Sequence, residues 1–270
     1  MKRLLASLLV AVLVLSLTGV ATAAANRASD MAKDKAPNLE RIEFIHWKKD
    51  FAKPPCNNNG TCEPELGENK SCPDCKKNGG DEEPPPESTC YAFMVQYGPR
   101  LLKWGDLPVD YVINPANSGL LETEVTSAIS AAAGEWDEHA DVDIFGSYST
   151  AFGDTTTYND QNFVNAISFG DYYSNPDIIG ACMIWYSPAT KTIVEFDIIF
   201  ETNYTWGVSG AEILMDLQNI ATHELGHAVG LADIYETECA AVTMYGYSSY
   251  GETDKSSLEL PDITGIKQLY

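Results

Sequence analysis

The sequence is short of cationic side chains: 17 lysine and arginine residues stand against 39 aspartate and glutamate residues, for a formal net charge of -22. A field of that sign repels the phosphates of nucleic acids and anionic lipid surfaces, so we expect neither as a partner. Solubility is the plainest reason for the acidic excess. A cation-binding role for some of the carboxylates is the alternative.

Long hydrophobic runs are also scarce, because only the first 25 residues contain one. MKRLLASLLVAVLVLSLTGVATAAA begins with two cations, continues with an apolar run and ends with small residues. This pattern is typical of a secretory signal peptide, with Ala21 and Ala23 in an AxA-like cleavage site. An uncleaved membrane anchor is the alternative, although the run is short and interrupted for a spanning helix. We therefore expect a secreted, extracellular protein that makes no membrane contact after cleavage of residues 1–25.

Three segments before residue 90 contain few of the apolar residues that a core requires. Residues 26–55 are polar apart from the patch IEFIHW, and we interpret them as a leader or pro-segment of little independent stability. Residues 56–75 form a Cys-rich module, which export to an oxidising compartment stabilises by disulfides rather than by zinc. The sequence leaves open the connectivity of Cys56, Cys62, Cys72, Cys75 and Cys90. Residues 76–89 combine glycine, proline and charge, as an exposed linker does.

Residues 90–270 carry the periodic patterns of one compact domain. The predicted strands lie within residues 91–97, 107–113, 163–169, 180–187 and 191–201. The predicted helices are residues 122–139, a helix that opens with a capping box at Ser209 and Glu212 and ends at Gly230, and residues 260–270. These elements indicate the α+β class with a mixed twisted sheet, and we expect a monomer.

Histidine is scarce, with four in the chain, yet two of them stand four residues apart in HELGH. On a helix, positions i and i+4 lie on one face, so His223 and His227 can direct ring nitrogens at one metal ion. Glu224 lies about 100° further round the helix, too far for a third ligand of that face. It can instead take a proton from a water that zinc activates. The pattern alone is weak evidence, because two surface histidines on a helix would also produce it.

The residues after HELGH strengthen the zinc hypothesis. Gly230 permits the positive-φ turn that ends a helix and returns the chain toward the metal. Asp233 then brings a carboxylate oxygen, and Met244 follows in VTMYGY, where it can form an apolar turn beneath the imidazoles. We predict that Asp233 is the third zinc ligand, with a hydrogen bond to a ligating imidazole as the alternative role. The other histidines, His46 in the leader and His139 at the end of an acidic helix, are interpreted as solvated or cap-like.

HELGHAVGLAD, the preceding DLQNIA, the turn at Met244 and the closing DITGIKQLY together resemble the metzincin metallopeptidases, and most closely their matrixin branch. The similarity extends over roughly residues 91–270. It implies a twisted mixed five-stranded sheet above a cleft, an active-site helix, a Met-turn and a C-terminal helix. It also implies one catalytic zinc held by His223 and His227, with Glu224 as the general base and Met244 in the Met-turn.

The chain departs from the matrixin pattern in several places. The third matrixin ligand is a histidine, whereas here Asp233 stands in that position, as in the small snapalysin group. Matrixins bind a second, structural zinc through histidines before the active-site helix, but this sequence has none between residues 140 and 222. The PRCGxPD cysteine motif of matrixin pro-segments is also missing. Calcium could bind Asp154, Asp171 and Asp197, although acidic loops are common without it.

The resemblance places the substrate beside the edge strand of the sheet, for which we predict Gly180, Ala181, Cys182, Met183 and Ile184. The sequence offers no later strand to cover this edge, so the substrate backbone should add as an extra strand. Cys182 lies in that strand and Cys239 in the loop after Asp233. We therefore expect a disulfide between these two cysteines that fixes the loop of the third ligand.

Together these features predict a secreted zinc endopeptidase that acts on proteins or peptides. One alternative is a non-enzymatic extracellular binding protein on the same fold, and another is a zinc hydrolase of non-peptide amides. Glu224 argues against the first, because binding alone would not require it. An edge strand beside the site favours extended peptides over the second.

Overall fold

The computed structural model describes residues 38–49, 90–94, 96–97, 100–153 and 160–270. The predicted signal peptide, Cys-rich module and linker lie outside the described residues and stay predictions. Leu39–Tyr270 forms one compact unit. Within the described ranges, no helix combines the length and the apolar character needed to cross a membrane.

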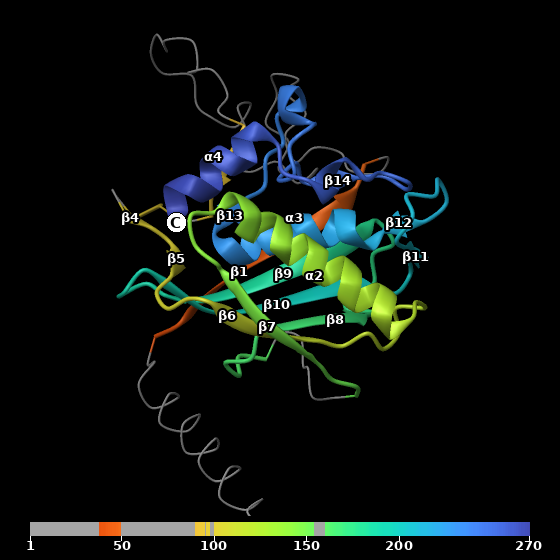
Figure 1. The fold of residues 1–270 in the computed structure, drawn as a ribbon, viewed down its shortest axis with the longest axis horizontal. Coiled ribbons are helices and arrows are strands. Elements are labelled where there is room, and N and C mark those ends of the chain that lie inside the picture. Colours follow the sequence, from red (N-terminus) through yellow and green to blue (C-terminus); the bar gives the residue numbers. More distant parts are fainter. Residues whose placement is uncertain (1–37, 50–89, 95, 98–99, 154–159) are drawn as a thin grey trace, which may run out of the picture. The chain divides into compact units, whose positions relative to one another are not determined.

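The described residues form one large mixed sheet of eight strands, in the order β14-β1-β9-β10-β8-β6-β7 with β5 paired to β10 (Figure 1). Its strands are β1 (Glu40–Lys48), β5 (Lys103–Trp104), β6 (Val109–Ile113), β7 (Phe145–Thr150), β8 (Ala166–Gly170), β9 (Ile178–Ser187), β10 (Thr192–Glu201) and β14 (Tyr247–Ser248). β9 is antiparallel to both of its neighbours, β1 and β10, and the other pairs are parallel. The predicted mixed sheet is confirmed, but it has eight strands where five were expected.

Three two-stranded ladders lie outside the large sheet. They pair β2 (Ala92–Phe93) with β13 (Leu231–Ala232), β3 (Gln96–Tyr97) with β4 (Arg100–Leu101), and β11 (Trp206–Gly207) with β12 (Met215–Asp216). The strand predicted over residues 91–97 is therefore two short pieces. The amide of Met94 donates to the carbonyl of Gly230 at 3.1 Å, which ties this segment to the end of the helix that contains HELGH.

The described residues contain three α-helices and two short 3₁₀ turns. These are α2 (Glu122–His139), α3 (Leu217–Val229), α4 (Leu260–Leu269), η3 (Thr237–Cys239) and η4 (Asp254–Ser256). Figure 1 shows α2 and α3 covering one face of the large sheet. The range predicted for α2 is confirmed, and its indole at Trp136 donates to the carbonyl of Thr222 in α3 at 2.8 Å. The two helices are thus joined by a buried hydrogen bond as well as by packing.

The start of α3 differs from the prediction. No capping box opens the helix at Ser209; it begins at Leu217, and the carboxylate of Asp216 accepts the amide of Asn219 at 3.0 Å. Because Met215 of β12 pairs with Trp206 of β11, the chain just before Leu217 is extended rather than helical. The predicted end is confirmed, since Gly230 caps the helix with φ 117°, in the left-handed region that favours glycine.

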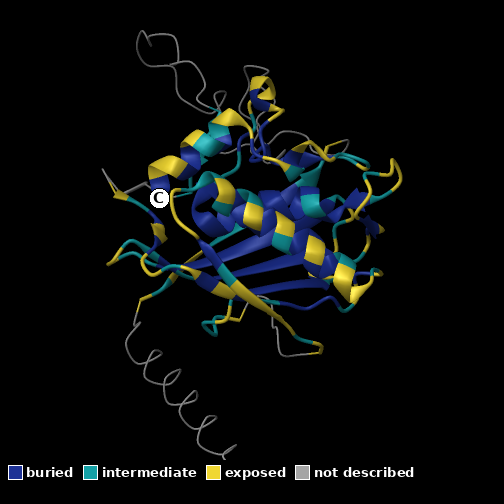
Figure 2. Ribbon diagram, viewed as in Figure 1, coloured by how far each residue is buried: buried dark blue, intermediate teal, exposed yellow. Residues whose placement is uncertain are grey.

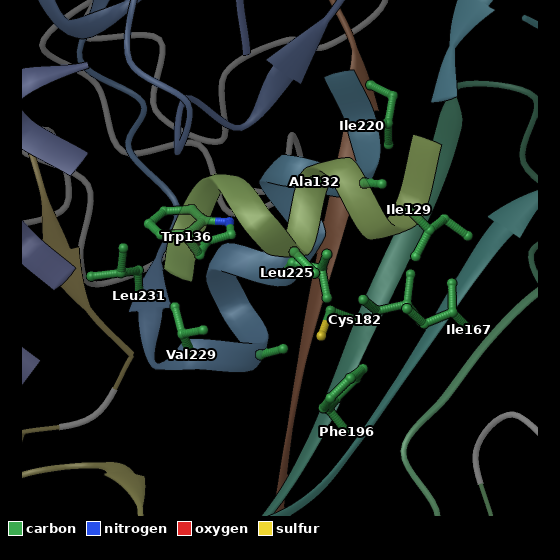
Figure 3. Close-up of a cluster of buried hydrophobic side chains, with 14 of the residues drawn as sticks. Ile129, Ala132, Trp136, Ile167, Cys182, Phe196, Ile220, Leu225, Val229 and Leu231 are labelled. Atoms are coloured by element: carbon green, nitrogen blue, oxygen red, sulfur yellow. The ribbon is translucent and has the colours of Figure 1, made fainter. Parts of the chain in front are cut away.

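The core lies between the helices and the sheet. Figure 2 shows α3 buried along almost its whole length, whereas α2 exposes one face. In the core close-up, Ile129 of α2, Leu225 of α3 and Phe196 of β10 belong to one apolar cluster (Figure 3). Each fully buried side chain of this kind contributes about 1.5–3 kcal/mol. This packing fixes α3, the helix that carries HELGH.

The patch IEFIHW is not part of a loose leader but lies in β1. β1 pairs antiparallel with β9 from Glu40 opposite Tyr186 to Trp47 opposite Ile178. The outer edge of β9 would otherwise present a row of unpaired N–H and C=O groups, and β1 satisfies them. Sequence periodicity gives no sign of this pairing, because the two strands are separated by more than 120 residues of chain.

Candidate active site

Helix α3 brings His223 and His227 together as the i, i+4 spacing predicts. Their Nε2 atoms lie 3.2 Å apart, and both side chains are buried. His223 Nδ1 lies 2.8 Å from the carbonyl of Thr243, and His227 Nδ1 lies 3.0 Å from the carbonyl of Leu231. A carbonyl oxygen only accepts, so each Nδ1 must carry the hydrogen and donate it. Both Nε2 atoms then present lone pairs to each other.

Asp233 completes a cluster of three atoms that face one another and carry no hydrogen. The turn at Gly230 and the short strand β13 carry the chain back, so that Asp233 Oδ1 lies 3.2 Å from His223 Nε2 and 3.5 Å from His227 Nε2. Asp233 Oδ2 accepts the hydroxyl of Tyr235 at 3.1 Å.

The donor set fits a zinc ion. Two lone pairs and an anionic oxygen at these separations repel one another unless a cation lies between them. Three ligands at about 2.0–2.2 Å from one tetrahedral ion stand about 3.3–3.6 Å apart, close to the three observed separations. Asp233 Oδ1 is buried and has no hydrogen-bond partner among the described residues, as a free ligand atom would.

Glu224 lies beside this cluster rather than in it. Its side chain is fully buried, and neither carboxylate oxygen has a hydrogen-bond partner within the described part of the chain. Burial, and then the negative charge of Asp233, raise the pKa of Glu224 well above its ordinary value. A carboxyl group with a raised pKa and free oxygens is suited to accept and return a proton.

Met244 lies in a turn beneath α3. The amide of Tyr245 donates to the carbonyl of Val242 at 3.2 Å, and a methyl group placed on Gly226 would stand only 2.2 Å from Met244 Sδ. The amides of Thr243 and Met244 donate to the buried carboxylate of Asp262 in α4 at 2.9 and 3.2 Å. Sequence reasoning missed Asp262, although an acidic residue in the first turn of the last helix was visible.

His46 was interpreted as solvated or cap-like, and the structure shows it buried at the site. Its ring meets the His223 ring edge-on with centroids 3.9 Å apart, and its Nε2 lies 2.9 Å from Ser248 Oγ. Phe44, two residues earlier on the same face of β1, stacks on His227 at 4.0 Å. His139, by contrast, lies in the last turn of α2, where its Nε2 is 3.4 Å from Glu135 Oε1.

The predicted disulfide between Cys182 and Cys239 is wrong. Cys239 bonds to Cys90, with their Cα atoms 5.3 Å apart, and Cys182 is a buried thiol not bonded to any cysteine in the described residues. Figure 3 shows Cys182 in the apolar cluster between the sheet and α3, where burial raises its pKa. The loop after Asp233 is therefore tied to the start of the domain rather than to β9.

The predicted edge strand, from Gly180 to Ile184, does lie beside the site, but it is not an edge. It is the middle of β9 and is paired on one side with β10 and on the other with β1. The prediction was wrong because the strand that covers β9 comes before it in the sequence, in β1, and not after it.

Calcium binding stays a prediction. Asp154 lies outside the described residues, and neither metal-compatible cluster in the described part of the chain includes Asp171 or Asp197. Asp197 Oδ1 accepts the amide of Ala166 at 3.2 Å, which gives this buried carboxylate a role inside the sheet.

The mixed sheet, the helix with HELGH and the turn at Met244 define a domain of the metzincin type. A family model described as matrixin matches residues 103–270, more than half of the chain, and the chain belongs to the matrixin family. No curated protein matches it. Membership of this family implies zinc metallopeptidase activity and a catalytic zinc.

Proposed function

We propose that the chain is a secreted zinc endopeptidase in which His223, His227 and Asp233 hold the metal. The observation that carries this proposal is the convergence of two imidazole lone pairs and one carboxylate oxygen, at separations of 3.2, 3.2 and 3.5 Å, beside a buried glutamate. A histidine pair on a helix surface would not be fixed in this way by backbone carbonyls.

The residues divide the work of hydrolysis between them. Bound zinc supplies a Lewis acid that polarises the scissile carbonyl and makes a nearby water more acidic. Glu224 takes a proton from the attacking water and passes it to the nitrogen of the departing amine. Asp233 adds a negative charge to the ligand set, so more of the activation falls to Glu224 than in a site of three neutral imidazoles.

Proteins or peptides are the proposed substrates, bound as an extended strand along β9. β9 runs beside the site, but β1 is paired with its outer row of backbone groups in this structure, so a substrate strand would have to take the place of β1. Such recognition uses main-chain atoms and suits peptides better than small amides.

We propose a monomer with a signal peptide at 1–25, a leader at 26–55, a Cys-rich module at 56–75, a linker at 76–89 and the peptidase domain at 90–270. The bond between Cys90 and Cys239 fits export to an oxidising compartment.

Hydrolysis of casein tests this function. The chain is assayed intact and after cleavage at a site-specific protease sequence inserted between residues 76 and 89. We expect hydrolysis by the cleaved chain that a chelator abolishes and zinc restores. Glu224→Gln should lower the rate by at least about 100-fold while zinc stays bound, and Glu238→Gln, a change at an exposed position in η3, should not alter it.

The rival function, a binding protein that keeps the fold, makes a different prediction. It requires a cleaved chain that binds zinc with full stoichiometry yet hydrolyses nothing, with Glu224→Gln indistinguishable from the parent. That result would overturn the enzymatic proposal.

A further inference from the structure

We propose that Asn203 carries an N-linked glycan, which covers exposed apolar side chains beside the turn between β10 and β11. The inference goes beyond the proposed function and rests on one part of it, the export of the chain, because N-glycans are attached to proteins that enter the secretory route. No proposed metal ligand and no proposed catalytic residue takes part in it.

Residues 203–205 read Asn-Tyr-Thr, which is the N-x-[ST] pattern at which N-glycans are attached. The pattern also recurs by chance, so the folded chain has to meet a second condition, which is exposure of the asparagine. Two further copies of the pattern begin at Asn59 and Asn69 and lie outside the described residues. Asn203 is therefore the copy that can be compared with the fold.

The turn that follows β10 presents both residues that the pattern requires. Asn203 and Thr205 are exposed, whereas Tyr204 between them is buried. A glycan is bulky and hydrated, so the asparagine that carries it must reach water in the folded protein. The position of Asn203 meets this condition.

Neighbouring side chains hold this turn in place without help from Asn203. The hydroxyl of Tyr204 donates to the carbonyl of Pro176 at 2.7 Å, and the indole of Trp206 donates to the carbonyl of Glu201 at 3.0 Å. The Asn203 side chain makes no hydrogen bond to any residue that the structure describes. Its amide nitrogen can therefore be modified without the loss of a contact that the fold needs.

Exposed apolar side chains lie on the segments that pack around this turn. They are Val208 (42% exposed), Ile213 (80%) and Tyr250 (43%). The carbonyl of Thr205 accepts the amide of Met215 at 2.9 Å, and the ring of Tyr204 lies 5.7 Å from the ring of Tyr250. Apolar side chains that gather on a surface favour association between chains. A hydrated glycan rooted at Asn203 would cover these three side chains and oppose that association.

The modification is a glycosyl transfer whose donor is a lipid-linked oligosaccharide of the export pathway. Nδ2 of Asn203 forms a bond to C1 of the first sugar, and the bond between that carbon and the phosphate oxygen of the lipid carrier breaks. The leaving group is a polyisoprenyl phosphate or diphosphate. Nδ2 gives up one of its two hydrogens as a proton, and no group is oxidised or reduced.

Mass spectrometry of the intact chain, secreted by the cells it comes from, tests the site. Digestion of the denatured chain after glutamate releases residues 202–212, in which Asn203 is the only asparagine. We expect this peptide to carry sugar in most molecules, with fragment ions that place the sugar on Asn203. Asn117 is the internal control: it is also exposed in a turn, but Ser118 and Gly119 follow it, so it should stay unmodified.

Variants at Thr205, expressed in a secretory host that attaches N-glycans, test whether the pattern is what is recognised. Thr205→Ala should abolish the modification of Asn203, whereas Thr205→Ser should retain it. Both variants keep the backbone carbonyl that accepts the amide of Met215. A glycan that persists in Thr205→Ala would overturn the assignment of an N-linked site.

Binding of an apolar fluorescent dye to the secreted chain tests the covering role. Asn203→Gln removes the glycan and should raise the fluorescence several-fold, because the apolar side chains become accessible. Adding Ile213→Ser to this variant should return the signal toward that of the parent. Equal fluorescence of the parent and Asn203→Gln would overturn the covering role.

The outcomes separate this inference from the proposed function. Neither readout uses hydrolysis, so an inactive protein would give the same results. A secreted chain with the bond between Cys90 and Cys239 formed and an unmodified Asn203 would overturn the glycan and leave the proposed function standing. A chain retained in the cytoplasm, with these cysteines reduced and Asn203 unmodified, would overturn both the glycan and the proposed secretion.

Discussion

Helix α3 and strand β1 both bring histidines to one site, but they are held in different ways. α3 is buried along nearly its whole length, and backbone carbonyls fix each of its imidazoles. β1 is buried fully only at His46 and is held mainly by backbone pairing at its two edges. The helix that carries the two proposed histidine ligands is therefore part of the core, whereas β1 is attached to the domain mainly through its paired edges.

The largest expected effect concerns Asp233, the proposed ligand that follows α3 and β13. Asp233→Ala should weaken zinc binding by roughly 100-fold or more, because it removes one of three ligands and leaves two. Metal analysis after dialysis against a competing chelator measures this. Asp106→Ala, at an exposed position before β6, is the control and should keep its zinc. Full zinc retention by Asp233→Ala would show that the carboxylate is not a ligand.

The second prediction concerns the loop that carries Asp233. Replacing both Cys90 and Cys239 by serine should lower the free energy of unfolding by about 2–5 kcal/mol, since the bond closes a long loop of the unfolded chain. Denaturant unfolding followed by tryptophan fluorescence measures the change. Cys182→Ala should cost less, because that thiol makes no cross-link in the described residues. The prediction fails if the two variants unfold at the same midpoint.

Packing beneath α3 gives a third test. Gly226→Ala should destabilise the domain by about 1–3 kcal/mol, because the new methyl group would meet Met244 Sδ and the ring of Trp136. Gly134→Ala, on the exposed side of α2 with open space around it, should be neutral or stabilising. A Gly226→Ala protein as stable as its parent would mean that the Met244 turn does not press on the helix.

The smallest expected effect is a dependence of stability on pH, at a glutamate that belongs to neither metal-compatible cluster of the described residues. Burial raises the pKa of Glu201 to about 7, above the ordinary value of 4.5. The folded state therefore binds this proton more tightly than the unfolded state. The resulting stabilisation of the fold is fully present below pH 4.5 and is lost as the pH rises toward 7. Glu201→Gln should flatten this part of the stability profile by about 1 kcal/mol. Identical slopes for the parent and the variant would contradict the shift.

The sequence predicted best what is encoded locally. The HELGH spacing, the glycine that ends α3 and the apolar stripe of α2 each depend on residues within a few turns, and these predictions of local structure are confirmed. The hairpin of β9 and β10 is also local and lies where it was predicted. Such features follow from backbone geometry and periodicity alone.

Long-range pairing could not be predicted in the same way. The partner of Cys239 is Cys90, 149 residues away, and the cover of β9 comes from the leader. IEFIHW looked like an isolated patch because nothing in its own neighbourhood complements it. The role of His46 was missed for the same reason, since a lone histidine carries no signal until the fold places it beside His223.

X-ray absorption at the zinc edge of the secreted, full-length chain measures the proposed ligand set. We expect one zinc per chain, with two imidazole nitrogens and a carboxylate oxygen at about 2.0–2.2 Å and no sulfur ligand. In Asp233→His the metal should be retained and the number of imidazole ligands should rise from two to three. A spectrum with sulfur ligands, or one unchanged by Asp233→His, would contradict the site described for His223, His227 and Asp233.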